Sequence, residues 1–345
     1  MLKEYRLANG TTKKVHLLGW KKQPTDHRDE AYRLKLHGSF FSVPSTLDLR
    51  SICSAIEDQG PLGSCTANAL AGCVEANEIR QGAKLSKPAL VTAQAALMPA
   101  ARGLKAALPT VNVTNVGVNA SGVISYTTTI TPAAGPTPGP TPTPTPTPSP
   151  TPTPTKLIQV SRLFEYYATR KLEGSTSEDS GATIRDTIKA AYTYGIADES
   201  AWPYDVNKFA VNPPQSVWTA AASHKVTSYH AITDGDLQTM KSVLAQQYLI
   251  EFGFSVYDYF MSADMAAKAL LGVPKSGESF QGGHAVCLCG YDDNKPMPDN
   301  TKGAFLVRNS WGADWGLGGY FWMSYAYVGN TRLASDFWVV QSSPV

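Results

Sequence analysis

The sequence has no strong charge of either sign and no long hydrophobic run. Its formal net charge is only +2, and lysine and arginine are scattered rather than clustered. This argues against a nucleic-acid or acidic-membrane partner. No stretch approaches the ~18 uninterrupted apolar residues of a membrane span. The 345 residues are 43% hydrophobic and 17% charged, which describes a globular protein with a substantial core.

Cysteine is scarce, and no secretion signal is visible. The five cysteines are Cys53, Cys65, Cys73, Cys287 and Cys289. Charged Lys3, Glu4 and Arg6 stand where a signal peptide would have its apolar run. We therefore expect reduced thiols rather than a disulfide framework, in an intracellular or virion-associated protein.

Charge is absent altogether from residues 106–155. The β-branched first part, 106–131, predicts a hairpin or a small sheet. The second part, 132–155, is a Pro/Thr-rich linker, for which we expect extended polyproline II. We interpret 91–157 as an insertion. It is either a tolerated surface loop or a tether that holds 106–131 out toward a partner.

Outside this insertion the apolar pattern predicts helices first and strands later. Residues 1–42 are polar and basic, and we expect this N-terminal extension to lie outside the main core. Residues 64–81 predict a helix that Gly82 ends. Two more helices are expected at 159–174 and 180–196, and strands at 43–51, 224–232, 247–257, 282–293, 303–312 and 318–325. This order favours an α+β fold with two lobes.

Cys65 stands at the start of the predicted helix, directly after a glycine-bearing turn. A helix N-terminus offers unpaired N–H groups and a positive partial charge, so we expect the pKa of Cys65 to fall below its usual ~8.5. A thiolate there would be a nucleophile, and a nearby imidazole could form an ion pair with it. His284, after two glycines and before an apolar strand, is the strongest candidate, because glycine permits close approach. Asn309 could orient that imidazole, and Trp311 could shield the bond.

Three motifs in this order, "QGPLGSC", "GGHAV" and "RNSWG", are similar to those of the papain-like cysteine peptidases, the peptidase C1 type. "TYGIADESAWPYD" resembles a further segment of that family. The resemblance runs from about Val43 to Trp338, apart from the insertion. It is closest to a prokaryotic or viral-like variant without the long prodomain. It implies a papain-like two-lobe fold, with a helical left lobe, a β-barrel-like right lobe and an active-site cleft between them.

The spacing of the motifs agrees with this resemblance once the insertion is removed. His284 follows Cys65 by 219 positions. Leaving out the 67 residues of 91–157 reduces this to 152, close to the roughly 130–150 expected. Leu62 and Thr66 replace the family's first cysteine and its aromatic residue, so the usual disulfide from that first position cannot form.

The resemblance implies a role for each matched residue. Cys65 would be the nucleophile, His284 its partner and Asn309 the group that orients His284. Gln59 and the backbone N–H of Cys65 would form the oxyanion hole, and Trp311 would support the site by covering Asn309. The substrate cleft would include Ser180, Gly181 and Gly283. No metal and no cofactor is implied.

The sequence therefore predicts a cysteine-type peptidase in residues 43–345, interrupted by 91–157, that acts on a peptide or protein through a thioester. Residues 1–42 would be a short propeptide lying across or beside the cleft and restraining it. Two alternatives stay open. One is a papain-fold binding or structural protein without activity that uses the charge-free insertion, and the other is acyl transfer to an amine instead of water.

Overall fold

The computed structural model contains two compact units. They are Met1–Ala83 with Thr155–Val345, and Lys84–Pro154. The residues it describes are 2–17, 19–24, 26–32, 43–97, 110–118, 124–131 and 158–342. The Pro/Thr-rich linker at 132–155 lies outside them.

The second unit has a two-stranded antiparallel hairpin. Its strands are β4 (Thr110–Val118) and β5 (Ile124–Thr131), with Thr110 opposite Thr131. The β-branched residues of this segment predict such a pairing, because they favour extended backbone.

Helix α1 (Cys65–Leu97) is longer than its sequence suggests. The prediction that Gly82 ends the helix is wrong, because α1 continues to Leu97. Glycine terminates a helix when it adopts a left-handed conformation, and Gly82 is not among the glycines with positive φ. In a helix interior it costs only about 1 kcal/mol relative to alanine.

The two other predicted helices of the first lobe are confirmed, together with their end signals. Helix α2 (Arg162–Glu173) begins where Ser161 accepts a hydrogen bond from a backbone N–H, and it ends at Gly174 with φ 74°. Helix α3 (Ile184–Thr193) begins at Thr183 in the same way. These helices and α4 (Gln215–Ala221) enclose a small apolar cluster of Phe164, Ala168, Ala190, Ala197, Val217 and Ala221.

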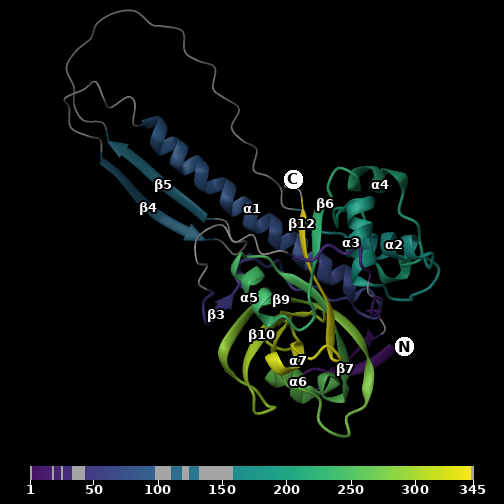
Figure 1. Ribbon diagram of the computed structural model, residues 1–345. Coiled ribbons are helices and arrows are strands. Elements are labelled where there is room, and N and C mark those ends of the chain that lie inside the picture. The colour runs from purple at the N-terminus through teal and green to yellow at the C-terminus, as the bar shows by residue number, and fades with distance from the viewer. Residues whose placement is uncertain are drawn as a thin grey trace, which may run out of the picture. The chain divides into compact units, whose positions relative to one another are not determined.

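The second lobe is built on one large sheet, whose strands occur in the order β6-β12-β7-β9-β10-β11-β8, with β3 added beside β9. The expected barrel is not closed, because β6 and β8 form separate ends of this path. The strands are β3 (Thr46–Asp48), β6 (Val226–Ile232), β7 (Ile250–Tyr257), β8 (Leu270–Leu271), β9 (Phe280–Pro296), β10 (Lys302–Arg308), β11 (Tyr320–Ser324) and β12 (Ala334–Ser342). Figure 1 shows α2 and α4 on one side of this unit and the long strands on the other.

Short helices interrupt the part of the chain in which we expected strands alone. In each of the three helices that follow α4, a hydroxyl or carboxylate side chain at the first turn accepts a backbone N–H. The alternation of apolar residues that predicts strands does not reveal this capping signal. The helices are α4, α5 (Leu237–Ala245), α6 (Ala263–Lys268) and α7 (Tyr325–Val328), with 3-10 turns η1 (Arg50–Ile52), η3 (Val206–Lys208) and η4 (Asp258–Met261).

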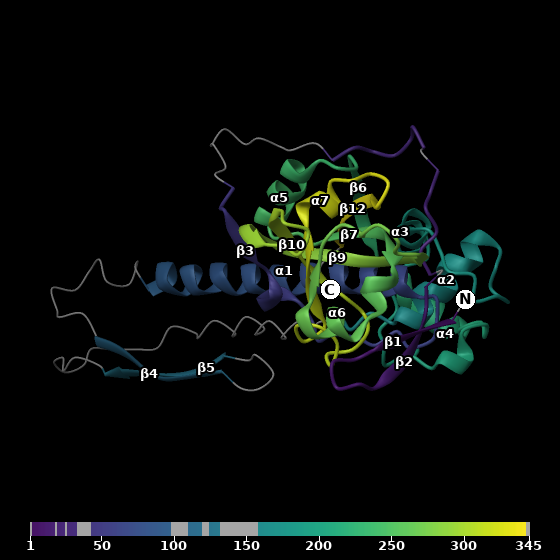
Figure 2. The ribbon, with the colours of Figure 1, turned by 90° about the horizontal axis from the view of Figure 1, so that it is seen from below.

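The N-terminal extension is part of the core, contrary to expectation. Strands β1 (Leu2–Arg6) and β2 (Thr12–His16) form an antiparallel hairpin, which Figure 2 shows in purple near α6. The buried side chains of this region are Tyr5, Leu7, Val15, Leu17 and Trp20, all members of the main apolar cluster. The residues on either side of the buried Tyr5 and Val15 are polar or charged, so one face of the hairpin is more buried than the other.

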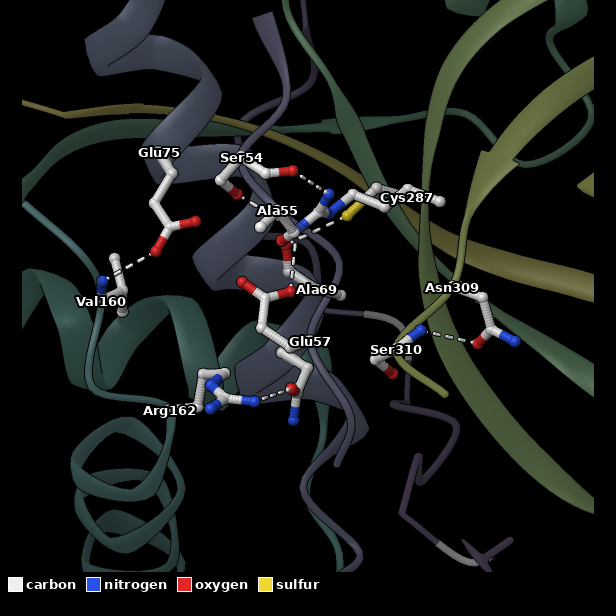
Figure 3. Close-up of polar contacts among 12 residues, drawn as sticks. Ser54, Ala55, Glu57, Ala69, Glu75, Val160, Arg162, Cys287, Asn309 and Ser310 are labelled. Carbon is white, nitrogen blue, oxygen red and sulfur yellow. Dashed lines mark hydrogen bonds and ion pairs between the residues drawn. The ribbon is translucent and has the colours of Figure 1, made fainter. Parts of the chain in front are cut away.

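Arg308, the last residue of β10, joins the sheet to the segment that precedes α1. Its guanidinium donates to the backbone oxygens of Ser54 and Ala55 at 2.8 and 2.7 Å, and it pairs with Glu57 at 2.8 Å (Figure 3). Both members of the ion pair are buried, which makes the pair costly to break.

We predict that Arg308→Met lowers the free energy of unfolding by about 3–5 kcal/mol, because it leaves Glu57 charged and unpaired in the interior. Urea denaturation measures this. Arg50→Met is a matched control, because the Arg50–Asp48 pair is about half exposed and such pairs are worth less than about 1 kcal/mol. Equal losses in the two variants would contradict the prediction.

Candidate active site

Cys65 is the first residue of α1 and is completely buried. The N-terminal chain passes directly over its sulfur: a Cβ atom added to Gly19 would lie 2.6 Å from Cys65 Sγ and 3.0 Å from the oxygen of Gly63. Only glycine fits at position 19, since any side chain would occupy the place of the sulfur. We call Leu17 and Gly19–Lys21 the covering segment.

The covering segment is held by backbone hydrogen bonds to both lobes. The Gly283 N–H donates to the oxygen of Leu17 at 2.7 Å. On the other side, the Ala182 N–H donates to the oxygen of Gly19 at 2.8 Å, and the Lys21 N–H donates to the oxygen of Ala182 at 2.9 Å. The segment therefore spans the two lobes as an added strand would.

Burial changes the acidity of the thiol. It raises the pKa of Cys65 to about 12, although the backbone N–H groups of Ala285 and Thr66 favour the thiolate. The expectation of a lowered pKa is wrong for this covered state. The helix N-terminus is present, but the loss of hydration outweighs it.

His284 lies on β9, one residue before the Ala285 N–H that interacts with the Cys65 sulfur. Its Nε2 is 2.8 Å from Asn309 Oδ1. Because this oxygen also accepts the Ser310 N–H, the proton of that bond comes from His284 Nε2. Burial lowers the pKa of His284 to about 4, so the imidazole is neutral here.

The thiol and the imidazole are not hydrogen bonded to each other in the covered state. His284 Nδ1 has no hydrogen-bond partner in the part of the chain that the structure describes. The structure thus brings His284 and Asn309 into direct contact, and it brings Cys65 next to the residue after His284.

Trp311 forms an apolar cover over the imidazole. Its ring lies 5.1 Å from that of His284, at an interplanar angle of 34°. Phe260 packs against Trp311 from one direction, and Tyr5 of the N-terminal hairpin stacks on it at 4.5 Å. The hairpin therefore contributes directly to the exclusion of water from His284.

Gln59 is fixed in place by hydrogen bonds at both ends of its side-chain amide. Its Oε1 accepts the Ser310 hydroxyl at 2.7 Å, and its Nε2 donates to the oxygen of Leu62 at 3.0 Å. Ser310 follows Asn309 in the chain, so one short segment, shown in Figure 3, positions both Gln59 and Asn309. The second hydrogen of the Gln59 amide is left for another acceptor.

Two of the three predicted cleft residues contact the covering segment, and the third, Gly181, directly precedes Ala182, which pairs with it. Gly283 bonds Leu17, and Ser180 Oγ lies 3.4 Å from Lys21 Nζ. Gly181 has φ 67° and donates its N–H to the hydroxyl of Tyr166.

Sequence reasoning missed Ala182, which makes the actual strand-like pairing with the covering segment. An alanine backbone carries no side-chain signal. Only its place next to Gly181 could have indicated it.

Trp20 is the largest side chain of the covering segment. The pocket that holds it was not predicted from the sequence either. A Cβ atom added to Gly253 or Gly283 would meet the indole at 2.0 and 2.7 Å. The indole Nε1 donates to Asp336 Oδ2 at 3.0 Å, and the Gln23 N–H donates to the same oxygen at 3.1 Å. Burial raises the pKa of Asp336 to about 6.

Ion pairs hold the N-terminal chain in place before the covering segment, at Lys13, and at its last residue, Lys21. Lys13 Nζ lies 3.1 Å from Asp58 and 2.9 Å from Asp314. Lys21 Nζ lies 2.8 Å from Glu173. All these groups are only partly buried, so each pair is worth about 0–1 kcal/mol.

The part of the chain that the structure describes has neither a metal-binding cluster nor a membrane-spanning helix. It contains no group of three or more His, Cys, Asp or Glu side chains that could hold a metal ion. None of its helices combines the length and the apolar character that crossing a membrane requires.

One family model and several known sequences are similar to this chain. A family model described as "Papain family cysteine protease" matches residues 174–340. An uncharacterized peptidase C1-like protein, L477, of Acanthamoeba polyphaga mimivirus is 45% identical over 188 residues, 52% of this chain and 58% of the relative. Pro-cathepsin H of Bos taurus is 28% identical over 130 residues, 38% of this chain and 36% of the relative. The chain thus spans less than two thirds of either relative.

Similar solved structures cover almost the whole chain. Xylellain, a cysteine protease from Xylella fastidiosa, superimposes with a TM-score of 0.64 at 28% identity, over 96% of this chain and 98% of the other. Digestive procathepsin L2 from the larval midgut of Tenebrio molitor gives 0.57 at 18% identity, over 94% and 78%. At 18% identity, the similarity to procathepsin L2 shows a shared fold.

We predict that Cys65 in the folded chain reacts with iodoacetamide on the order of a thousandfold more slowly at pH 8 than in urea, because a pKa of about 12 leaves little thiolate. Peptide mapping of the alkylated protein measures this. Cys53 is an internal control: it is partly exposed, and the neighbouring Cys289 and Arg308 lower its pKa. A Cys65 that reacts as fast when folded as when unfolded would refute the covered state.

Proposed function

Because the chain belongs to the papain-like family of C1 cysteine peptidases, we propose that it hydrolyses peptide bonds with Cys65, His284 and Asn309. One observation carries this proposal. The start of α1 and strand β9 meet so that the Ala285 N–H interacts with the Cys65 sulfur, while the preceding residue, His284, is hydrogen bonded to Asn309. A nucleophile, a base and an orienting amide thus converge from three distant parts of the sequence.

The reaction uses each group in turn. His284 takes the proton of the Cys65 thiol, and the thiolate attacks the carbonyl carbon of a peptide bond. The tetrahedral intermediate collapses to a thioester as His284 gives its proton to the leaving amine. Water, deprotonated by His284, then attacks the thioester, and Cys65 is released with the new carboxylic acid. Throughout, Asn309 accepts the Nε2–H bond and keeps Nδ1 available for the moving proton.

The developing oxyanion needs two donors near the sulfur. The Cys65 N–H belongs to the first helical turn, where the N–H groups have no partner within the helix. The Gln59 amide keeps one hydrogen available, and Ser310 and Leu62 fix its direction. A donor fixed in this way needs no reorganisation during the reaction, and each such donor contributes on the order of 3 kcal/mol to the lowering of the barrier.

We also assign the N-terminal extension, residues 1–42, the role of a restraint. The covering segment occupies the space above the sulfur that a substrate carbonyl would need. It also dries the site, which favours the neutral thiol and the neutral imidazole over the ion pair. Displacement of the segment would admit both substrate and water. The same movement would therefore open the site to substrate and favour the Cys65–His284 ion pair.

The natural substrate would be a peptide or protein in extended form, because the groups that bind the covering segment are backbone groups of Ala182 and Gly283. A virion-associated or intracellular location stays a prediction, with which the viral relative is in keeping.

We predict that Lys13→Ala combined with Lys21→Ala raises the basal rate of peptide hydrolysis roughly tenfold. Removing both fastenings costs the covered state on the order of 1.4 kcal/mol. A fluorogenic peptide assay measures the rate. Lys14→Ala is the matched control, because Lys14 neighbours Lys13 but is exposed and on the other face of β2. Equal rates in all three proteins would show that the segment imposes no restraint.

In this double variant, Cys65→Ala is expected to abolish hydrolysis while the circular dichroism spectrum and the melting temperature stay close to those of the parent. His284→Ala should cause a similar loss. Combining the two should add little, because they act as one catalytic unit. Residual turnover in the Cys65→Ala protein would overturn the assignment of the nucleophile, and a Cys65 unreactive toward a peptidyl vinyl sulfone would favour a binding protein.

A further inference from the structure

Four of the five cysteines take no part in the proposed reaction, and all four lie along strand β9. Cys287 and Cys289 are both on β9, and Cys289 lies at a register shift of the pairing with β10, between Leu288 and Gly290. Cys73 on α1 lies next to Cys287, and Cys53 in the segment before α1 lies near Cys289. The sulfurs therefore meet in two pairs, each joining β9 to the chain around α1.

The inner pair is Cys73 and Cys287. Their sulfur atoms are 3.6 Å apart, and both residues are completely buried or nearly so. The Cys287 sulfur also lies 3.0 Å from the oxygen of Ala69, one turn before Cys73 (Figure 3). A disulfide requires about 2.05 Å, so side-chain rotations that bring the sulfurs roughly 1.5 Å closer would suffice. Their backbones already lie on packed, adjacent elements.

The outer pair is Cys53 and Cys289, whose thiols lie close enough to shift each other's pKa. The Leu49 N–H donates to the backbone oxygen of Cys289 at 2.9 Å, and the Cys53 sulfur lies 3.5 Å from the oxygen of Leu49. Cys53 is the only partly exposed one among the five, which are all described by the structure. The guanidinium of Arg308 lies near it and favours its thiolate.

We propose that these cysteines form two redox-active dithiols, Cys73–Cys287 and Cys53–Cys289, which a small disulfide of the glutathione type oxidises to two cross-links between β9 and the chain around α1. Cys65 has no thiol partner in this arrangement and stays reduced. The odd number of cysteines thus resolves into two pairs and one nucleophile.

The chemistry balances for each pair. The Cys53 thiolate attacks one sulfur of oxidised glutathione, which breaks its S–S bond, forms a mixed disulfide and releases one glutathione thiolate. The Cys289 thiolate then attacks the Cys53 sulfur and releases the second glutathione. The dithiol loses two electrons and two protons, and oxidised glutathione takes up both to become two thiols. The same exchange applies to the inner pair, more slowly, because it must await local opening.

The cross-links would connect the two elements that carry the proposed catalytic groups. Cys73 lies two helical turns after Cys65, and Cys287 lies three residues after His284. The closed loop between Cys73 and Cys287 spans 214 positions, so the cross-link removes much freedom from the unfolded chain. The oxidised protein should melt at a higher temperature, and its Cys65 should remain a reduced thiol.

The test incubates the full chain to equilibrium with oxidised glutathione at pH 8, a few degrees below its melting temperature. Free thiols are then alkylated in urea without reduction, and the peptides are mapped. The expected products are Cys73–Cys287 and Cys53–Cys289, with Cys65 alkylated, and a melting temperature about 5 °C above that of the reduced protein. Cys73→Ser and Cys53→Ser should each lose one cross-link and keep the other, and Cys65→Ser should keep both.

Other products would overturn the proposal. A Cys287–Cys289 link, a link through Cys65, cross-linked dimers or mixed glutathione adducts as the final products would show that the pairs do not act as dithiols. Five free thiols after equilibration would do the same. An increase in melting temperature that persists in the double variant Cys53→Ser, Cys73→Ser would assign the stabilisation to another cause.

Discussion

Exclusion of water from the junction between the first turn of α1 and strand β9 is the constraint on which the site depends. In the proposed mechanism, the Cys65 thiol and the His284 imidazole are a reactive ion pair or two inert neutral groups, according to whether water reaches them. Burial raises the pKa of the first to about 12 and lowers that of the second to about 4. Each shift favours the uncharged form. In the proposed restraint, the covering segment and Tyr5 would act by dehydration as much as by blocking the site.

The N-terminal extension has two structural tasks that are hard to separate. Its hairpin supplies buried side chains to the main core, and its covering segment crosses the sulfur. Its charged fastenings are exposed enough to be weak, whereas Trp20 and the backbone pairing are buried. With this combination, the covering segment would be stable in place. A competing strand, or cleavage of the extension, could still displace it.

Much of this arrangement was predictable from the sequence, and the failures have identifiable causes. The motifs around Cys65, His284 and Asn309 carry side-chain chemistry, so they could be found in the sequence, and α2 and α3 carry clear capping signals. Ala182 acts through its backbone and leaves no such trace. Gly82 was expected to end α1, but glycine ends a helix only where the chain turns into a left-handed conformation. The pairing of Cys73 with Cys287 joins residues 214 positions apart, and no local pattern reports such a contact.

The carboxylate of Asp336 has a consequence for whatever replaces the covering segment. Both of its donors, the Trp20 indole and the Gln23 N–H, belong to the N-terminal chain and would depart together. The vacated recess would then have a floor of bare glycine backbone at Gly253 and Gly283 and an acid at its base. An incoming peptide would meet this unsatisfied acceptor at once. A bulky side chain tipped with an N–H group would satisfy it, and a purely aliphatic one would leave the acid dependent on solvent.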